Sequence, residues 1–122
     1  MKVREYEYIM QKVLQVVDEG VHVLDREGNT IIYNEAMAKL EKLQRKGVLR
    51  RPFTEVFRNI SEEESTLLQA LYNKKVTLNK QQTYLNMEGK VINAINSTIP
   101  VIYNDQVIAA IEVSKDVTDI RR

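Results

Sequence analysis

The sequence predicts a single α+β domain in which short helices cover an antiparallel β-sheet. A chain of 122 residues is long enough to close one hydrophobic core but not two. An amphipathic helical pattern opens the chain, and long runs of β-branched residues separated by tight turns close it. The expected order is therefore a helix, two strands, small helices and three strands.

Residues 3–18 are predicted to form the first helix. Its apolar residues recur at alternating spacings of three and four, which places them on one helical face. These residues are Val3, Tyr6, Met10, Val13 and Val17. The stripe is too short for a stable coiled coil on its own, so it must pack against its own domain or a second copy. We expect Gly20 to end this helix.

The next segment is predicted to be a β-hairpin. Residues 21–25 and 30–33 are rich in β-branched and aromatic side chains, and Gly28 lies in the turn between them. Asn34 is then expected to cap a helix that begins at Glu35 and is stopped by Gly47.

A second covering helix is predicted over residues 61–73. Ser61 and Glu64 form a capping-box pattern at its start, and leucines supply its apolar face. Three long strands are expected to follow, over residues 76–86, 91–103 and 107–115. The tight turns between them favour an antiparallel meander.

Composition narrows the classes of function. The formal net charge of +1 argues against a domain whose main function is to bind the phosphate backbone of nucleic acids. One basic run, residues 39–51, is interpreted as a solvated helix face. The chain has no cysteine, so we expect no disulfide and no structural zinc. No transmembrane run or secretion signal is apparent, which favours the cytoplasm.

Side-chain alternation divides the predicted sheet into two faces. The apolar face carries Val21, Val23, Ile95, Ile99, Ile111 and Val113. The opposite face carries His22, Gln82, Tyr84, Asn96, Thr98, Glu112 and Ser114. By pattern alone, the apolar face would pack on the helices and the polar face would meet water.

The element order, the hairpin and cap over residues 25–34 and the closing Asp116-Val117-Thr118 resemble a PAS domain over about residues 20–118. Residues 21–25, 64–71 and 95–100 are similar to the N-terminal sensory domain of sigma-54-dependent transcription activators of the arginine-utilisation type. The resemblance implies a five-stranded antiparallel sheet in the order 2-1-5-4-3. It also implies a homodimer formed through the helix of residues 1–19 and the outer sheet face. Residues 119–122 would begin a linker to downstream ATPase and DNA-binding domains.

The resemblance also reverses the expected orientation of the sheet, so that the polar face lies under the helices. The implied ligand-binding residues are His22, Leu24, Gln82, Tyr84, Asn96, Thr98, Glu112 and Ser114. Buried polar groups need partners, so we expect a small polar guest such as arginine, ornithine or citrulline. Glu112 could bind a cationic group, Asn96, Thr98 and Ser114 could donate to a carboxylate, and His22 could do either.

Other functions are weighed against these residues. Haem would need an axial ligand, for which His22 is the single histidine, and a flavin–cysteinyl adduct would need a cysteine. We expect neither cofactor and no metal. Glu112 and His22 lack the further groups of a catalytic constellation, so we expect no enzyme. A PAS dimerisation or protein-interaction module without a ligand stays open. A cavity of a few hundred cubic ångströms would favour a ligand over such a module.

Overall fold

The computed structural model describes residues 1–118. Its five strands form one antiparallel sheet in the predicted order, β2-β1-β5-β4-β3. The strands are β1 (Gly20–Asp25), β2 (Thr30–Tyr33), β3 (Thr77–Leu85), β4 (Val91–Tyr103) and β5 (Gln106–Asp116). The helices are α1 (Val3–Val16), α2 (Glu35–Glu41), α3 (Phe53–Val56) and α4 (Thr66–Asn73), with a 3-10 turn η1 (Arg45–Gly47). The predicted linker, residues 119–122, lies outside the described residues.

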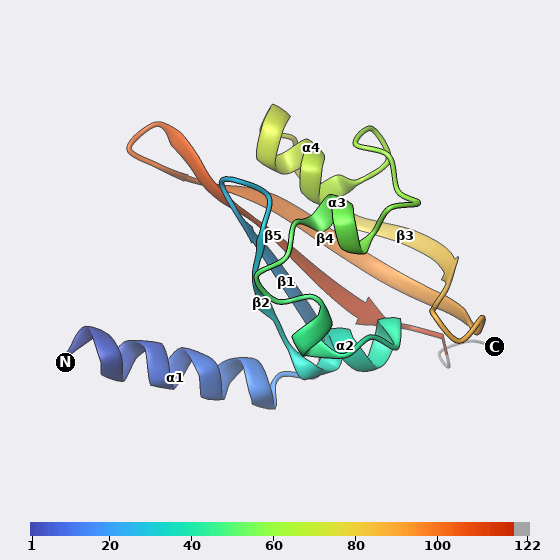
Figure 1. Ribbon diagram of the computed structural model, residues 1–122, viewed down its shortest axis with the longest axis horizontal. Helices are drawn as coiled ribbons and strands as arrows, with labels where there is room; N and C mark the ends of the chain where they lie inside the picture. Colours follow the sequence, from blue (N-terminus) through green and yellow to red (C-terminus); the bar gives the residue numbers. More distant parts are fainter. Residues whose placement is uncertain (119–122) are drawn as a thin grey trace.

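Three short helices cover one face of the sheet, whereas α1 extends away from the body of the domain (Figure 1). The core lies under this cover in two apolar clusters. One joins Leu24 to Phe53 and to the leucines of α4. The other joins Tyr33 to Met37 and Val48. The inner face of the sheet is therefore the one that carries His22, Leu24, Asn96 and Ser114.

The turns of the sheet follow the predicted chemistry. Asp25 Oδ1 accepts from the backbone N–H groups of Glu27 (2.9 Å) and Asn29 (3.0 Å) and so shapes the β1–β2 turn. Between β4 and β5, Asn104 and Asp105 both have positive φ, 51° and 62°. That pair of dihedrals is typical of a two-residue hairpin whose twist matches the flanking strands.

Helix α2 is shorter than predicted. It ends at Glu41 because Lys42 is left-handed, with φ 59° and ψ 48°, and the helix does not continue to Gly47. The chain instead turns back through η1, which buries Val48 against the cluster around Met37. The early end places Glu41 at the last position of the helix.

Helix α4 begins at Thr66 and not at Ser61. Ser65 caps it by accepting from Leu68 N at 3.1 Å. The bonds of the predicted capping box do form, since Ser61 N donates to Glu64 Oε1 and Glu64 N to Ser61 Oγ. They close a separate exposed turn, and only the following segment can bury its leucines on the sheet.

Gly20 begins β1 and does not end the first helix, which stops at Val16. A Cβ on Gly20 would lie 2.9 Å from Met37 Sδ and 3.0 Å from Met37 Cα. Gly20 therefore permits the close approach of α2 to the sheet.

Helix α1 contributes no buried residue to the domain. Its attachment depends on Asn34, whose Nδ2 donates to Leu14 O (3.2 Å) and Glu19 O (3.0 Å). Asn34 Oδ1 accepts from Val21 N and Met37 N, so one side chain joins α1, β1 and α2. Among residues 1–118, no helix is long and apolar enough to cross a bilayer.

Candidate functional site

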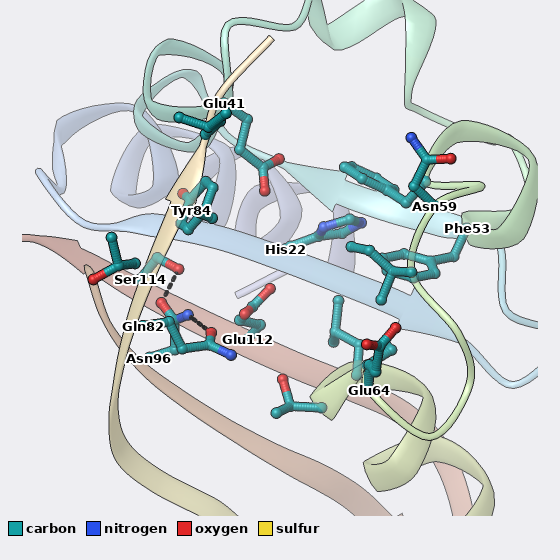
Figure 2. Close-up of a pocket in the computed structure, with 17 residues that line it drawn as sticks. His22, Glu41, Phe53, Asn59, Glu64, Gln82, Tyr84, Asn96, Glu112 and Ser114 are labelled. Atoms are coloured by element: carbon teal, nitrogen blue, oxygen red, sulfur yellow. Dashed lines mark hydrogen bonds between the residues drawn. The ribbon is translucent and has the colours of Figure 1, made fainter. Parts of the chain in front are cut away.

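A cavity of about 440 Å³ lies between the sheet and its helical cover. Its walls come from β1, β3, β4 and β5 on one side and from α2, α3 and the start of α4 on the other (Figure 2). The lining residues are His22, Glu41, Phe53, Phe57, Asn59, Ile60, Glu64, Ser65, Thr66, Leu67, Gln82, Thr83, Tyr84, Leu85, Asn96, Glu112 and Ser114. The polar strand residues thus lie beneath the helices and not in bulk solvent.

Three polar side chains on neighbouring strands are joined in a hydrogen-bonded row. Ser114 Oγ on β5 donates to Asn96 Oδ1 on β4, and Asn96 Nδ2 donates to Gln82 Oε1 on β3 (Figure 2). Ser114 and Asn96 are buried, so these bonds largely meet their polar requirements. Gln82 Nε2 has no acceptor among residues 1–118, so this amide is the end of the row that can donate to a guest.

The carboxylate of Glu112 lies on the floor of the cavity. Its position on β5 pairs with His22 on β1 and with Thr98 on β4. Within residues 1–118 no group donates a hydrogen bond to this carboxylate. Burial, with a further contribution from the charge of Glu41, raises the pKa of Glu112 to about 8.

Glu41 reaches the same cavity from the end of α2 (Figure 2). Its Oε1 accepts a hydrogen bond from the hydroxyl of Tyr33. Burial raises the pKa of Glu41 to about 7, and the Tyr33 hydrogen bond acts in the opposite direction. Burial and this carboxylate together raise the pKa of Tyr84 above its ordinary value.

His22 forms a neutral part of the wall. Its Nε2 lies 2.8 Å from Thr30 Oγ1, and burial lowers its pKa to about 4. The ring meets Tyr33 edge to face, with centroids 5.0 Å apart. It also lies beside Phe53 and Phe57, which stack with centroids 4.8 Å apart. This part of the cavity wall is therefore aromatic.

Two residues of the predicted ligand-binding set do not line the cavity. Leu24 is fully buried in the core with Phe53 and Leu67, because α4 packs directly over it. Thr98 is also fully buried, and its Oγ1 lies 2.9 Å from Thr66 Oγ1. Thr66 takes its place in the lining. His22, Gln82, Tyr84, Asn96, Glu112 and Ser114 surround the cavity, and their binding of a ligand stays a prediction.

The sequence analysis did not predict the cavity residues that come from the helices and from the loop before α4, above all Glu41. Strand alternation identifies only residues on the sheet, whereas α3 and the loop before α4 have no such period. A signal for Glu41 was present, since Met37 and Ala38, four and three residues earlier, share its helical face and are buried. An acid that continues an apolar stripe is a candidate for a buried functional group.

This sheet order, with the cavity beneath the helices, defines a domain of the PAS fold. The PAS domain of a protein from Colwellia psychrerythraea is 18% identical, with a TM-score of 0.71, and covers 94% of this chain and 99% of that one. An RNA-binding light-oxygen-voltage receptor is 17% identical, with a TM-score of 0.74, and covers 98% of this chain and 35% of that one. No family model matches the sequence.

A sequence relative is nearer. The chain is 38% identical over 114 residues to the transcriptional activator RocR of Bacillus subtilis strain 168. The matched region is 93% of this chain and 25% of the activator, so the chain spans about a quarter of that relative's length. The predicted similarity to a transcription activator's domain is confirmed.

Proposed function

We propose that this PAS domain is a sensor that binds a small polar metabolite bearing a cationic group, of the class of arginine, ornithine or citrulline. The observation that carries the proposal is the cavity between the sheet and the helices, which presents Glu41 and Glu112 and, among residues 1–118, has no lysine or arginine in its lining. A partly buried carboxylate that accepts no hydrogen bond, as Glu112 is among residues 1–118, favours a guest that brings an ammonium or guanidinium group.

The remaining lining suits the rest of such a molecule. Gln82 and Asn59 offer amide donors for a carboxylate, and both line the cavity. Phe53 and Phe57 offer an apolar wall for a methylene chain. The predicted donors Asn96 and Ser114 are engaged with each other, so they orient Gln82 more than they contact the guest.

Isothermal titration calorimetry with L-arginine, L-ornithine and L-citrulline tests this function. We expect saturable binding of at least one of them, weakened at least about tenfold in Glu112→Gln, which removes one charge-assisted contact. Glu63→Gln removes an exposed carboxylate outside the cavity and should bind as the wild type does. No binding of any of the three amino acids would contradict the proposal.

Strand β5 would carry the signal out of the domain. It bears Glu112 and Ser114 on the cavity and ends at Asp116. In a longer protein, the effectors would be the ATPase and DNA-binding domains of a cytoplasmic sigma-54-dependent activator. The similarity to RocR supports this arrangement, because it covers a quarter of an activator.

A second candidate is a PAS dimerisation module that needs no ligand. The exposed stripe of α1 favours it, because Val3, Tyr6 and Met10 are more than half exposed in the single chain. The two functions are compatible, and the titration separates a sensor that also dimerises from a module that only dimerises.

A further inference from the structure

The cavity collects negative charge that no basic side chain in its described lining neutralises. Three glutamates line it, and no lysine or arginine of residues 1–118 does. Glu64 differs from the other two because it is exposed and accepts from Ser61, whose hydrogen bonds lower its pKa. Its charge is therefore stabilised at the rim. The uncompensated charge belongs to Glu41 and Glu112.

These two carboxylates come from different layers of the domain. Glu41 ends α2 in the helical cover, and Glu112 stands on β5 in the sheet. Each is only partly buried, with its remaining accessible surface toward the cavity they share. A single guest between them would contact both layers.

Within the part of the chain that the structure describes, no neighbouring element supplies a lysine or arginine to the lining around the pair. The titratable groups around it are His22 on β1, Tyr33 on β2, Tyr84 on β3 and Glu64 in the loop before α4. His22 is neutral near pH 7, and both tyrosines keep their protons. The lining residues of α3, α4 and β4 are not titratable.

Two carboxylates that share a poorly solvated space cannot both be ionised without a counter-charge. The counter-charge can be a proton on the pair or the cationic group of a guest. We propose that a cationic guest replaces the proton that Glu41 and Glu112 hold in the ligand-free domain, so that this pair selects ligands by charge. The inference rests on the proposed function, since it concerns how the same cavity chooses its ligand.

The raised pKa values of Glu41, about 7, and Glu112, about 8, agree with a proton held by the pair at neutral pH. The interacting sites titrate as a pair, so the proton belongs to both. When a guanidinium or ammonium enters, the ionised form is favoured and the proton passes to the buffer. Affinity should then fall as the pH falls, by at most about tenfold per pH unit for each proton released.

Arginine and citrulline form a matched pair of probes. Their side chains have nearly the same shape, but arginine ends in a charged guanidinium and citrulline in a neutral urea. Arginine can displace the proton, whereas citrulline leaves it in place. We therefore expect arginine to bind at least about tenfold more tightly at pH 8 than citrulline, and this preference to shrink at pH 6.

The test is calorimetry of both amino acids in phosphate and in Tris, buffers with different ionisation enthalpies. For arginine, the heat of binding should differ between the buffers by the amount that release of about one proton requires. For citrulline the two heats should agree. Glu112→Gln and Glu41→Gln should each reduce the buffer dependence and the preference for arginine, whereas Glu63→Gln should retain both.

The outcomes separate this inference from the proposed function. Arginine binding with equal heats in both buffers, or citrulline binding as tightly as arginine at every pH, would overturn the inference and leave the sensor function standing. If no amino acid binds, the proposed sensor function is contradicted. The protonation of Glu41 and Glu112 is then tested by ¹³C NMR titration of the glutamate carboxyls in the ligand-free domain. A carboxyl that titrates near neutral pH would support the shared proton, and titration of every carboxyl near 4.5 would overturn it.

Discussion

At the residue scale, Glu112 shows how an acidic residue in the wall of a cavity can weaken the fold that carries it. Its inner-face position on β5 places an acid between His22 and Thr98, where neither neighbour neutralises it. The protonated form of Glu112 is therefore favoured in the folded state. In the unfolded chain the same carboxyl has its ordinary pKa and is ionised at neutral pH. A guest that supplies positive charge would remove this conflict, which links occupancy of the cavity to stability.

Between about pH 4.5 and pH 8, the pH dependence of folding follows from Glu112, from Glu41, whose raised pKa acts in the same direction, and from His22. Between the ordinary pKa of 4.5 and about 8, the folded state holds a proton on Glu112 that the unfolded state has lost, so stability falls as pH rises. His22 acts oppositely between about 4 and 6.5, because the unfolded state binds the extra proton. Between pH 6.5 and about pH 8, Glu112 and Glu41 therefore determine the slope.

We predict that the free energy of unfolding of the ligand-free domain declines from pH 6.5 to pH 8, and that Glu112→Gln flattens this decline. Urea denaturation at several pH values in this range measures both. Glu63→Gln, which changes an exposed acid, should keep the wild-type slope. A wild-type stability that stays constant or rises over this range would contradict the prediction.

At the scale of elements, strands were more predictable than helices. The bounds of β2 and β4 agree with the sequence pattern, because alternation and turn residues define a strand locally. The last residue of α2 and the first residue of α4 depended on where Val48 and the α4 leucines could be buried. That burial is set by tertiary packing and not by the local sequence. The same difference between strands and helices applies to the site. The polar cavity residues of the sheet were predicted from strand alternation, whereas Glu41 on helix α2 was not predicted.

The packing of α2 on β1 gives a prediction at this scale. Gly20→Ala should lower the free energy of unfolding by about 1–3 kcal/mol, because the new methyl group meets the backbone of Met37. Gly47→Ala is a matched control, since nothing lies within 4 Å of the position where its Cβ would stand. Equal stability of the two variants in urea denaturation would show that α2 does not need the close approach.

At the scale of the whole molecule, the apolar surface is distributed unevenly. The stripe residues Val3, Tyr6, Met10 and Val13 on α1, and Val17 directly after it, are all exposed. On the outer sheet face Ile99 is exposed as well, so the predicted apolar face lies opposite the cavity. The other residues of that face are less accessible, since Val23 is buried and Val21, Ile95, Ile111 and Val113 are partly buried. The exposed part of each surface is available to a second copy.

We predict that the chain forms a homodimer through α1 and that Val13→Lys shifts it toward the monomer, since a lysine within the apolar stripe would be buried at the interface. Sedimentation velocity over a concentration series measures the change. Gln11→Lys adds the same charge on a neighbouring exposed position of α1 outside the stripe and should leave the dimer intact. A monomeric wild type, or two variants that behave alike, would refute this interface.

Helix α2 has a different attachment at each end. Asn34, which caps its start, donates hydrogen bonds to the carbonyls of Leu14 and Glu19. Glu41, its last residue, lines the cavity. Seven residues of α-helix make a stiff rod only about 10 Å long. A shift of the whole helix would therefore move Glu41 and Asn34 together. Helix α2 is in this way a direct structural connection between the lining of the cavity and the segment that follows α1.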